Sequence, residues 1–334
     1  MELFELTKAL VDIDSVTGHE GPCAEFLRAT LDARGFAVEL QPVSPGRSNV
    51  LAFCGTPEVV LSTHFDTVPP FFPAREDAEW IHGRGACDAK GIVAAQVTAA
   101  ERLIAGGVRD FGLMFLVGEE TSSDGAQVAN QSPRGARFII NGEPTENKLA
   151  IATKGCLQLQ VRTHGKTAHS AYPDLGESAI DRLLDVLDDF RHLPLPRDFV
   201  LGTSTANIGV ISGGRAANVI PDEAEARIMI RTVTDSTDLR RQIASVLAGR
   251  CELEFVKDTP VMRMERLDGF ETNLVAFTTD LPSLSRWGRP LLLGPGSIAV
   301  AHTDHECVRK EDLLCAVDLY CELVKRLKKT TNYE

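Results

Sequence analysis

The sequence lacks the features that mark membrane-spanning and secreted proteins. No apolar run approaches the roughly 20 residues that a transmembrane helix requires. The N-terminal stretch M-E-L-F-E-L-T-K-A-L-V-D-I is acidic and amphipathic, and no basic region precedes it. It therefore predicts a helix of the fold and not a signal peptide. We expect a cytoplasmic protein.

Positive charge is also scarce. The chain has 35 Lys and Arg against 47 Asp and Glu, which gives a formal net charge of −12. Nucleic-acid backbones and anionic membranes both attract basic surfaces, so we expect neither nucleic acid nor a membrane as a partner. No internal repeat or low-complexity tract occurs.

The eight cysteines contain no C-x-x-C pair. They fall in apolar contexts of a long chain, and this pattern predicts reduced, buried thiols. Cys87 differs from the others because it directly precedes Asp88. It could influence a site there without binding a metal.

The chain does contain the composition and periodicity of an α/β protein. Its 334 residues, 43% hydrophobic and 25% charged, are typical of about two soluble globular domains. Up to about residue 153, strand-like apolar runs alternate with segments of helical periodicity. The predicted helices cover 3–13, 22–34 and 92–105, and the predicted strands cover 58–62, 112–117 and 138–140. This alternation favours an α/β layered fold.

The pattern changes between about residues 155 and 256. Leu157, Leu159 and Val161 alternate with polar residues as in a half-exposed strand. A helix near 179–190, strands at 205–212 and 224–232, a helix at 236–249 and a strand at 251–256 follow. This β-α-β-β-α-β order predicts a ferredoxin-like domain at 154–256, inserted into a catalytic domain made of 1–153 and 257–334. A helix at about 310–327 closes the chain.

Six dispersed segments carry residues that suit a metal-dependent hydrolase. Five of them follow or lie beside strand-like runs, and α/β proteins place their chemistry on the loops just beyond strand ends. The residues are His64 and Asp66, Asp88, Glu119 and Glu120, Glu143, His169, and His302.

Each of these segments alone has an ordinary explanation. His64 and Asp66 could form a solvated loop pair, and Asp88 could cap the helix that follows it. Glu119 and Glu120 could form an exposed acidic turn, but adjacent carboxylates after an apolar strand repel each other unless something neutralises one.

Histidine and carboxylate ligands suit Zn²⁺, with Co²⁺ or Mn²⁺ as substitutes. A bridging carboxylate would hold two such ions about 3.5–4 Å apart.

Seven motifs extend this pattern over essentially the full length: S-T-H-F-D-T-V-P, G-R-G-A-C-D-A-K-G, G-E-E, G-E-P-T, K-T-A-H-S-A-Y-P, N-V-I-P-D and G-P-G-S-I-A-V-A-H-T-D-H-E. In this order they resemble the co-catalytic metallohydrolases that include acetylornithine deacetylase, succinyl-diaminopimelate desuccinylase, aminoacylase and glutamate carboxypeptidases. The resemblance implies a zinc-peptidase-like α/β catalytic domain with the inserted ferredoxin-like domain forming a homodimer.

The resemblance also implies two zinc ions held by two groups of ligands. His64 and Glu143 would bind one ion, Glu120 and His302 would bind the other, and Asp88 would bridge both. His305 stands where the family usually has a small polar residue, so it remains a rival of His302. The family further implies a cis peptide bond between Asp88 and Ala89.

The remaining site residues receive their roles from the same resemblance. Glu119 would be the general base, and Asp66 would orient His64. His169 would reach the other subunit's active site and stabilise the oxyanion. The implied substrate contacts are Asn218, Arg231, Gly294 and Gly296.

The implied activity is hydrolysis of the amide bond of an N-acyl amino acid. N-acetylornithine is the first expectation, which would place the protein in arginine biosynthesis. Succinyl-diaminopimelate desuccinylase and dipeptidase or carboxypeptidase are the alternatives within the family. An inactive metal-binding interaction protein would be expected to lose Glu119 or His169, and both are present. A nucleotide-binding protein would need glycine where Asp88 stands.

Overall fold

The computed structural model describes residues 1–330, and the chain forms two compact units. The first comprises Met1–Ile151, Arg263–Asn273 and the segment from Thr279 onward. The second comprises Ala152–Met262 together with Leu274–Thr278, so it spans the predicted insertion at 154–256.

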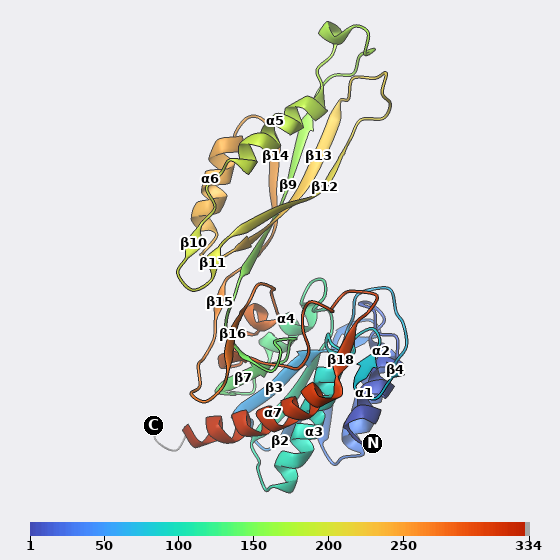
Figure 1. Ribbon diagram of the computed structural model, residues 1–334, viewed down its shortest axis with the longest axis vertical. Coiled ribbons are helices and arrows are strands. Elements are labelled where there is room, and N and C mark those ends of the chain that lie inside the picture. The colour runs from blue at the N-terminus through green and yellow to red at the C-terminus, as the bar shows by residue number, and fades with distance from the viewer. Residues whose placement is uncertain (331–334) are drawn as a thin grey trace. The chain divides into compact units, whose positions relative to one another are not determined.

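The first unit is built on a mixed sheet in which β1, β2, β6, β3, β7 and β17 follow one another (Figure 1). Their bounds are β1 Ala37–Ser44, β2 Arg47–Cys54, β3 Val59–His64, β6 Phe111–Leu116, β7 Phe138–Asn141 and β17 Arg289–Leu292. Strands β6, β3, β7 and β17 pair parallel with one another, whereas β1 pairs antiparallel with β2 and β2 pairs antiparallel with β6. Four parallel strands therefore end at the same edge of the sheet.

The remaining strands outside the inserted domain are short. Strands β8 (Leu149–Thr153), β15 (Met262–Arg263) and β16 (Thr272–Val275) lie where the chain passes from one unit to the other. A separate small sheet consists of β4 (Arg75–Glu76), β5 (Trp80–His82) and β18 (Cys307–Arg309).

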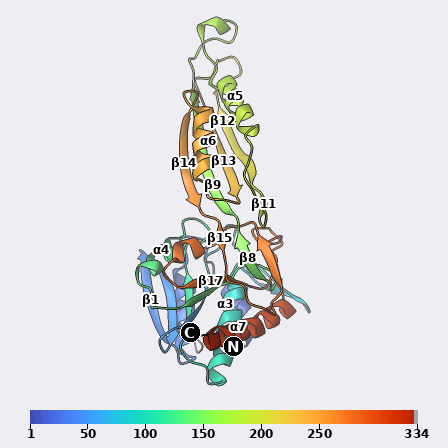
Figure 2. The same cartoon turned by 90° about the vertical axis from the view of Figure 1, so that its left-hand side faces the viewer.

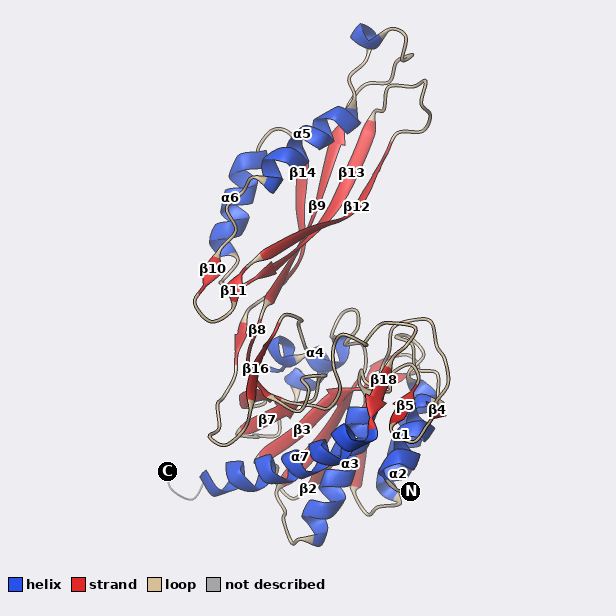
Figure 3. Ribbon diagram, in the orientation of Figure 1, coloured by secondary structure: helices blue, strands red, loops and turns tan. Residues whose placement is uncertain are grey.

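Helices cover both faces of the large sheet (Figure 3). The hydrophobic core of one face joins α1 (Leu3–Val11), α2 (Gly21–Asp32), α3 (Lys90–Ala105) and α7 (Lys310–Thr330) to alternate strand residues such as Val59 and Leu61. The opposite face carries α4 (Asp124–Gln131) and the short helix η2 (Leu281–Leu284), where Trp287 stacks on Phe53. Strand residues that alternate between two buried faces explain the continuous apolar runs of the sequence.

The second unit has the predicted β-α-β-β-α-β order. The elements are β9 (Gly155–His164), α5 (Ala179–Arg191), β12 (Thr205–Gly213), β13 (Glu223–Thr232), α6 (Thr237–Leu247) and β14 (Glu252–Thr259). The four antiparallel strands lie in the order β12-β13-β9-β14, and α5 and α6 pack on one face of this sheet (Figure 2). The predicted fold class, with its ferredoxin-like insertion, is confirmed.

Small elements decorate the second unit. They are the 3₁₀ helix η1 (Pro173–Leu175) and the hairpin of β10 (Arg197–Asp198) and β11 (Gly202–Thr203). Among residues 1–330, no helix combines the length and the apolar character that crossing a membrane requires.

All eight cysteines carry free thiols, but their burial differs from the prediction. Cys23, Cys87 and Cys156 are buried, four others are partly exposed, and Cys315 is exposed. The expectation of burial was therefore wrong for Cys315. Apolar neighbours in sequence do not determine which side of an amphipathic helix faces solvent.

Two leucines of α7 test how much the first unit depends on this packing. Leu323 is completely buried, whereas Leu314 is 44% exposed. We expect Leu323→Ala to lower the free energy of unfolding by about 2–5 kcal/mol, because it leaves a cavity against α3 and the sheet. Leu314→Ala on the same helix should change it by less than about 1 kcal/mol. Urea unfolding of both variants measures the difference, and equal losses would contradict the assignment of the buried face.

Candidate metal centre and active site

The ends of three neighbouring parallel strands bring the first candidate residues together. Strand β3 ends at His64, β6 is followed by Glu119 and Glu120, and β7 is followed by Glu143. Their carboxyl ends lie at one edge of the sheet, where α/β proteins commonly bind ligands. The alternation of the pleat explains why residues just beyond each strand can face a common space.

Two groups of potential metal ligands form at this edge, and they share one residue. His64, Asp88 and Glu143 form one group, and Asp88, Glu120 and His302 form the other. Within each group the candidate donor atoms lie within 4.8 Å of one another. Asp88 comes from the turn before α3 and lies between the two groups.

Asp88 directs a different oxygen toward each histidine. Its Oδ1 lies 3.0 Å from Nε2 of His64, and its Oδ2 lies 3.5 Å from Nε2 of His302. Glu143 Oε2 is 3.9 Å from the His64 nitrogen, and Glu120 Oε2 is 2.9 Å from the His302 nitrogen. A carboxylate with one oxygen in each group has the geometry of a bridging ligand.

The donor chemistry of both groups fits a divalent cation. Each group offers one imidazole nitrogen and carboxylate oxygens, the ligand types of zinc sites in hydrolases. His64, Asp88 and Glu143 are at most 5% exposed, and Oε1 of Glu143 has no hydrogen-bond partner among the described residues. A buried carboxylate oxygen without a partner is unfavourable unless a cation or a proton satisfies it.

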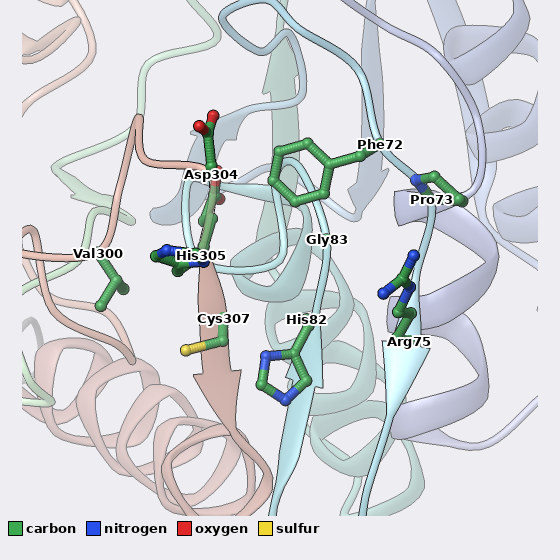
Figure 4. A pocket seen from close by; sticks show the side chains of 10 residues that line it. Phe72, Pro73, Arg75, His82, Gly83, Val300, Asp304, His305 and Cys307 are labelled. Atoms are coloured by element: carbon green, nitrogen blue, oxygen red, sulfur yellow. The ribbon is translucent and has the colours of Figure 1, made fainter.

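The second histidine is held differently from the first. His302 has a left-handed backbone with φ of 63°, and its side chain is 50% exposed. Its rival His305 is exposed and belongs to neither group. His305 lines a cavity of about 790 Å³, and no member of the two ligand groups lines it. Figure 4 shows His305 beside Val300 in this cavity.

Burial and the surrounding charges shift the ionisation of these groups in opposite directions. Burial alone would lower the pKa of His64, but Asp66, Asp88 and Glu143 together raise it well above its usual value. Hydrogen bonds to Asp88 and Glu120 raise the pKa of His302 to about 10. Burial raises the pKa of Glu143 well above its usual range. Positive charge between these side chains would favour ionised carboxylates and neutral histidines, which are the forms that bind metals.

Glu119 lies beside the second group without belonging to either. It is partly buried, and burial raises its pKa well above the usual range, with Asp280, Glu120 and Asp88 adding to the effect. The backbone N–H groups of Glu119 and Glu120 donate to the two oxygens of Asp66 at 3.1 and 3.3 Å. A free carboxyl with a raised pKa beside metal ligands is suited to exchanging protons.

Asp66 connects the first histidine with the Glu119–Glu120 turn. It is fully buried, and its Oδ1 lies 3.5 Å from Nδ1 of His64. Thr17 donates to its second oxygen at 2.7 Å. Hydrogen bonds from His64 and Thr17 hold the pKa of Asp66 below its usual value despite burial. Asp66 is therefore anionic and fixes two elements of the site at once.

The other predicted residues of the first unit have plain structural roles as well. A Cβ atom at Gly294 would lie 2.4 Å from the Glu143 carbonyl oxygen, and one at Gly296 would lie 2.5 Å from Sγ of Cys87. Close packing alone therefore requires glycine at both positions. The peptide bond between Asp88 and Ala89 is cis, as the resemblance implied.

Three predicted site residues belong to the second unit. His169 is exposed, and its Nδ1 accepts a hydrogen bond from the Ala171 N–H at 3.1 Å. Asn218 is exposed, and its carbonyl accepts from the Ser170 N–H. Arg231 lies in β13, and no carboxylate pairs with its guanidinium among residues 1–330. Their roles in binding and catalysis remain predictions.

Two further acidic residues near the site were not predicted as site residues. Glu306 is buried and contacts the turn that carries Asp88. Asp280 is 1% exposed, and neither of its carboxylate oxygens has a hydrogen-bond partner among the described residues. Burial raises its pKa to about 7. Glu306 is the last residue of the motif G-P-G-S-I-A-V-A-H-T-D-H-E. No feature of the sequence distinguished Asp280 from an ordinary loop residue.

Comparison with known proteins agrees with this architecture. Residues 151–253 match the peptidase dimerisation domain of the M20 type. A tripeptidase from Staphylococcus aureus has a TM-score of 0.84 at 21% identity and is covered to 98%, as is this chain. An M20 family metallo-carboxypeptidase from Sulfolobus solfataricus has a TM-score of 0.79 at 16% identity, with 98% of this chain and 99% of that one covered. At these identities the structures support the fold.

Similarity in sequence is stronger for two fungal proteins. A probable carboxypeptidase of Aspergillus clavatus is 38% identical, with 97% of this chain and 82% of that protein covered. An M20 peptidase domain-containing protein of Schizosaccharomyces pombe is 40% identical, with 96% of this chain and 84% of the relative covered. With this identity over nearly its whole length, the chain belongs to the M20 peptidase family.

Proposed function

We propose that this protein hydrolyses the peptide or amide bond of a small substrate that carries a free α-carboxylate, with two bound divalent cations as cofactors. The single observation that carries the proposal is the pair of ligand groups that share Asp88, with Glu119 beside them and bound to neither. A binding protein would have no need of a free carboxyl next to two metal ligands.

His64, Asp88 and Glu143 would hold one cation, and Asp88, Glu120 and His302 would hold the other. Zn²⁺ suits these donors best, and Co²⁺ or Mn²⁺ could substitute. When bound, the two ions would polarise the scissile carbonyl and make a water acidic enough to attack it near neutral pH. The unpartnered Oε1 of Glu143 supports a cation at the first group.

Glu119 is the general base and then the general acid of the proposed reaction. It takes a proton from the attacking water and delivers it to the leaving amine. Asp66 supports this role, because it fixes the backbone of both Glu119 and Glu120 through their N–H groups. The carboxyl of Glu119 can therefore move protons while its backbone stays in place.

His169 supplies a hydrogen-bond donor. Because Nδ1 accepts from the Ala171 N–H, the neutral ring carries its hydrogen on Nε2. An Nε2–H group suits stabilisation of the oxyanion that forms as water adds to the carbonyl. We propose that His169 acts in the active site of a partner subunit, with residues 151–253 forming the homodimer, since they match the peptidase dimerisation domain.

The substrate proposed first is a short peptide with a free C-terminus. The relative at 38% identity is named a probable carboxypeptidase, which supports cleavage next to a C-terminal residue. Arg231 has no acidic partner among residues 1–330 and could grip the α-carboxylate, with Asn218 beside the substrate. Gly296 would add a backbone N–H group, whereas the Gly294 N–H already donates to Thr145 Oγ1 at 3.0 Å.

N-acyl amino acids are the second candidate class. Their scissile amide also joins a carbonyl to an amino acid with a free carboxylate, so the same residues could act on them. The motif G-E-P-T supports N-acetylornithine within this class, and succinyl-diaminopimelate is its close rival.

A substrate panel tests the proposed function. Chelator-treated protein is loaded with Zn²⁺, Co²⁺ or Mn²⁺ and given dipeptides, tripeptides, their C-terminally amidated forms, N-acetylornithine and N-succinyl amino acids. We expect amine release from free-acid peptides, little from the amidated forms, and none after removal of the metal. Protein that holds two ions per chain but cleaves nothing in the panel would contradict the proposed reaction.

Glu119→Gln separates proton transfer from metal binding. The amide cannot accept and return a proton, so kcat should fall by about 10²–10⁴ while both ions remain bound. Elemental analysis and turnover are measured on the same sample. Glu39→Gln, an exposed carboxylate of β1 that pairs with Arg134, is the control and should keep full activity. Normal turnover by Glu119→Gln would show that Glu119 is not the general base.

His169→Ala tests the contribution from the partner subunit. It should lower kcat without loss of metal, because the oxyanion loses a donor. Mixing His169→Ala with Glu119→Gln under conditions of subunit exchange should restore part of the activity, since each hybrid dimer contains one intact site. His192→Ala, which changes an exposed histidine at the end of α5, serves as the control. Absence of any recovery despite demonstrated exchange would argue against action between subunits.

A further inference from the structure

Glu306 has an environment unlike that of any carboxylate in the two ligand groups. Its side chain is 1% exposed, and its Oε1 accepts three backbone hydrogen bonds. The donors are the N–H groups of Gly85, Cys87 and Asp88, at 2.9, 3.1 and 3.0 Å. One oxygen thus holds three of the four amides between Gly85 and Asp88, and the fourth, that of Ala86, donates to the Gly83 carbonyl. Such a cluster of backbone N–H groups is a strong site for an anion.

The second oxygen of Glu306 is paired with a buried cation. Nη1 of Arg84 donates to Oε2 at 2.6 Å, and Arg84 is itself 1% exposed. The guanidinium also donates to the carbonyls of Pro70 and Thr303 and lies over the ring of Phe72 at 4.9 Å. The Glu306 carboxylate is therefore held from both sides, and its position is closely defined.

These contacts connect both halves of the candidate metal centre. Glu306 stands four residues after His302, a member of the second ligand group. Its hydrogen bond to the Asp88 N–H ties that segment to the residue shared by both groups. The oxygens of Asp88 lie 3.0 Å from His64 and 3.5 Å from His302, so a small rotation of this turn would disturb both distances.

We propose that Glu306 is a positioning residue of the metal centre, which holds the turn from Gly85 to Asp88 so that Asp88 faces both ligand groups before any cation binds. This inference rests on the proposed function, because it assumes that the two groups bind metal. Glu306 itself contacts no ligand side chain within hydrogen-bonding distance; it acts through the backbone of Asp88.

Glu306 also lies at the wall of a surface cavity. It is one of the residues that line the cavity of about 790 Å³. Gly83, which follows β5, and Cys307 of β18 line it as well (Figure 4). The Glu306 side chain is nevertheless 1% exposed, so substitutions at position 306 are compared in pairs of similar length.

Two double variants test the contribution of the oxygen that accepts hydrogen bonds from the three N–H groups. Arg84→Met removes the buried cation in both, so neither variant leaves an unpaired charge beside it. In Arg84→Met with Glu306→Gln, the amide oxygen still accepts from the turn. In Arg84→Met with Glu306→Met, a side chain of similar length offers no such acceptor. The two double variants both lack the Arg84–Glu306 ion pair. They differ only in whether residue 306 offers an oxygen to the N–H groups of the turn.

Titration of the chelator-treated proteins with Zn²⁺ and Co²⁺ gives the readout. Wild type and the glutamine variant should bind two ions with similar affinity and the same visible Co²⁺ spectrum. The methionine variant should bind about 10–100-fold more weakly, as is typical when a residue that orients a ligand is lost, and its Co²⁺ spectrum should change. A purely structural role would lower thermal stability without changing the spectrum. Equal affinity and identical spectra in the two double variants would overturn the inference.

Hydrogen exchange of the wild-type protein provides a test that needs no variant. With chelator present, the amides of Gly85, Cys87 and Asp88 should exchange slowly, because their bonds to Glu306 require no metal. Rapid exchange of these amides would overturn the inference. If the wild-type protein takes up no Zn²⁺ or Co²⁺, the proposed function fails and this inference fails with it. If the wild-type protein binds two ions and the methionine double variant binds them equally well, only the role of Glu306 is contradicted and the proposed function stands.

Discussion

Repulsion among carboxylates is the constraint on which the site depends. Parallel strands β3, β6 and β7 end at one edge of the sheet, and the segments after them carry Asp66, Glu119, Glu120 and Glu143. Each acid raises the free energy of ionising its neighbours, and burial adds to this effect. The fold can hold these groups together only if hydrogen bonds, protons or cations offset their charge.

The acids fall into two kinds when their partners are compared. Asp66 and Glu306 accept several hydrogen bonds from backbone N–H groups and from the side chains of Thr17 and Arg84, so the protein itself provides partners for their oxygens. Asp88, Glu120 and Glu143 instead face imidazole nitrogens, and one Glu143 oxygen has no partner among the described residues. The first kind therefore positions the site, and the second kind presents oxygens to a cation. This division supports the proposed ligand set independently of any motif.

The sequence predicted the elements whose residues alternate regularly. The strand before His64, the helix after Asp88 and the inserted domain all follow from apolar periodicity. The small sheet of β4, β5 and β18 was missed because its strands are only two to three residues long. The β1–β2 hairpin was missed because β1 is largely exposed, although β2 contains a buried apolar run. Periodicity also could not show that Glu306 reaches back more than two hundred residues to the Asp88 turn. Such pairings depend on tertiary packing, which a local pattern does not encode.

Asp280 contributes to the charge of the site although it lies in none of the motifs. It follows no predicted strand, yet it lies close enough to raise the pKa of both Glu119 and Glu143. Its own pKa is raised to about 7, chiefly by burial, so near neutral pH a proton can occupy it at little free-energy cost. A protonated Asp280 adds no negative charge to the cluster, whereas an ionised one increases the attraction for cations. The charge at this edge of the sheet therefore depends in part on a residue outside both ligand groups.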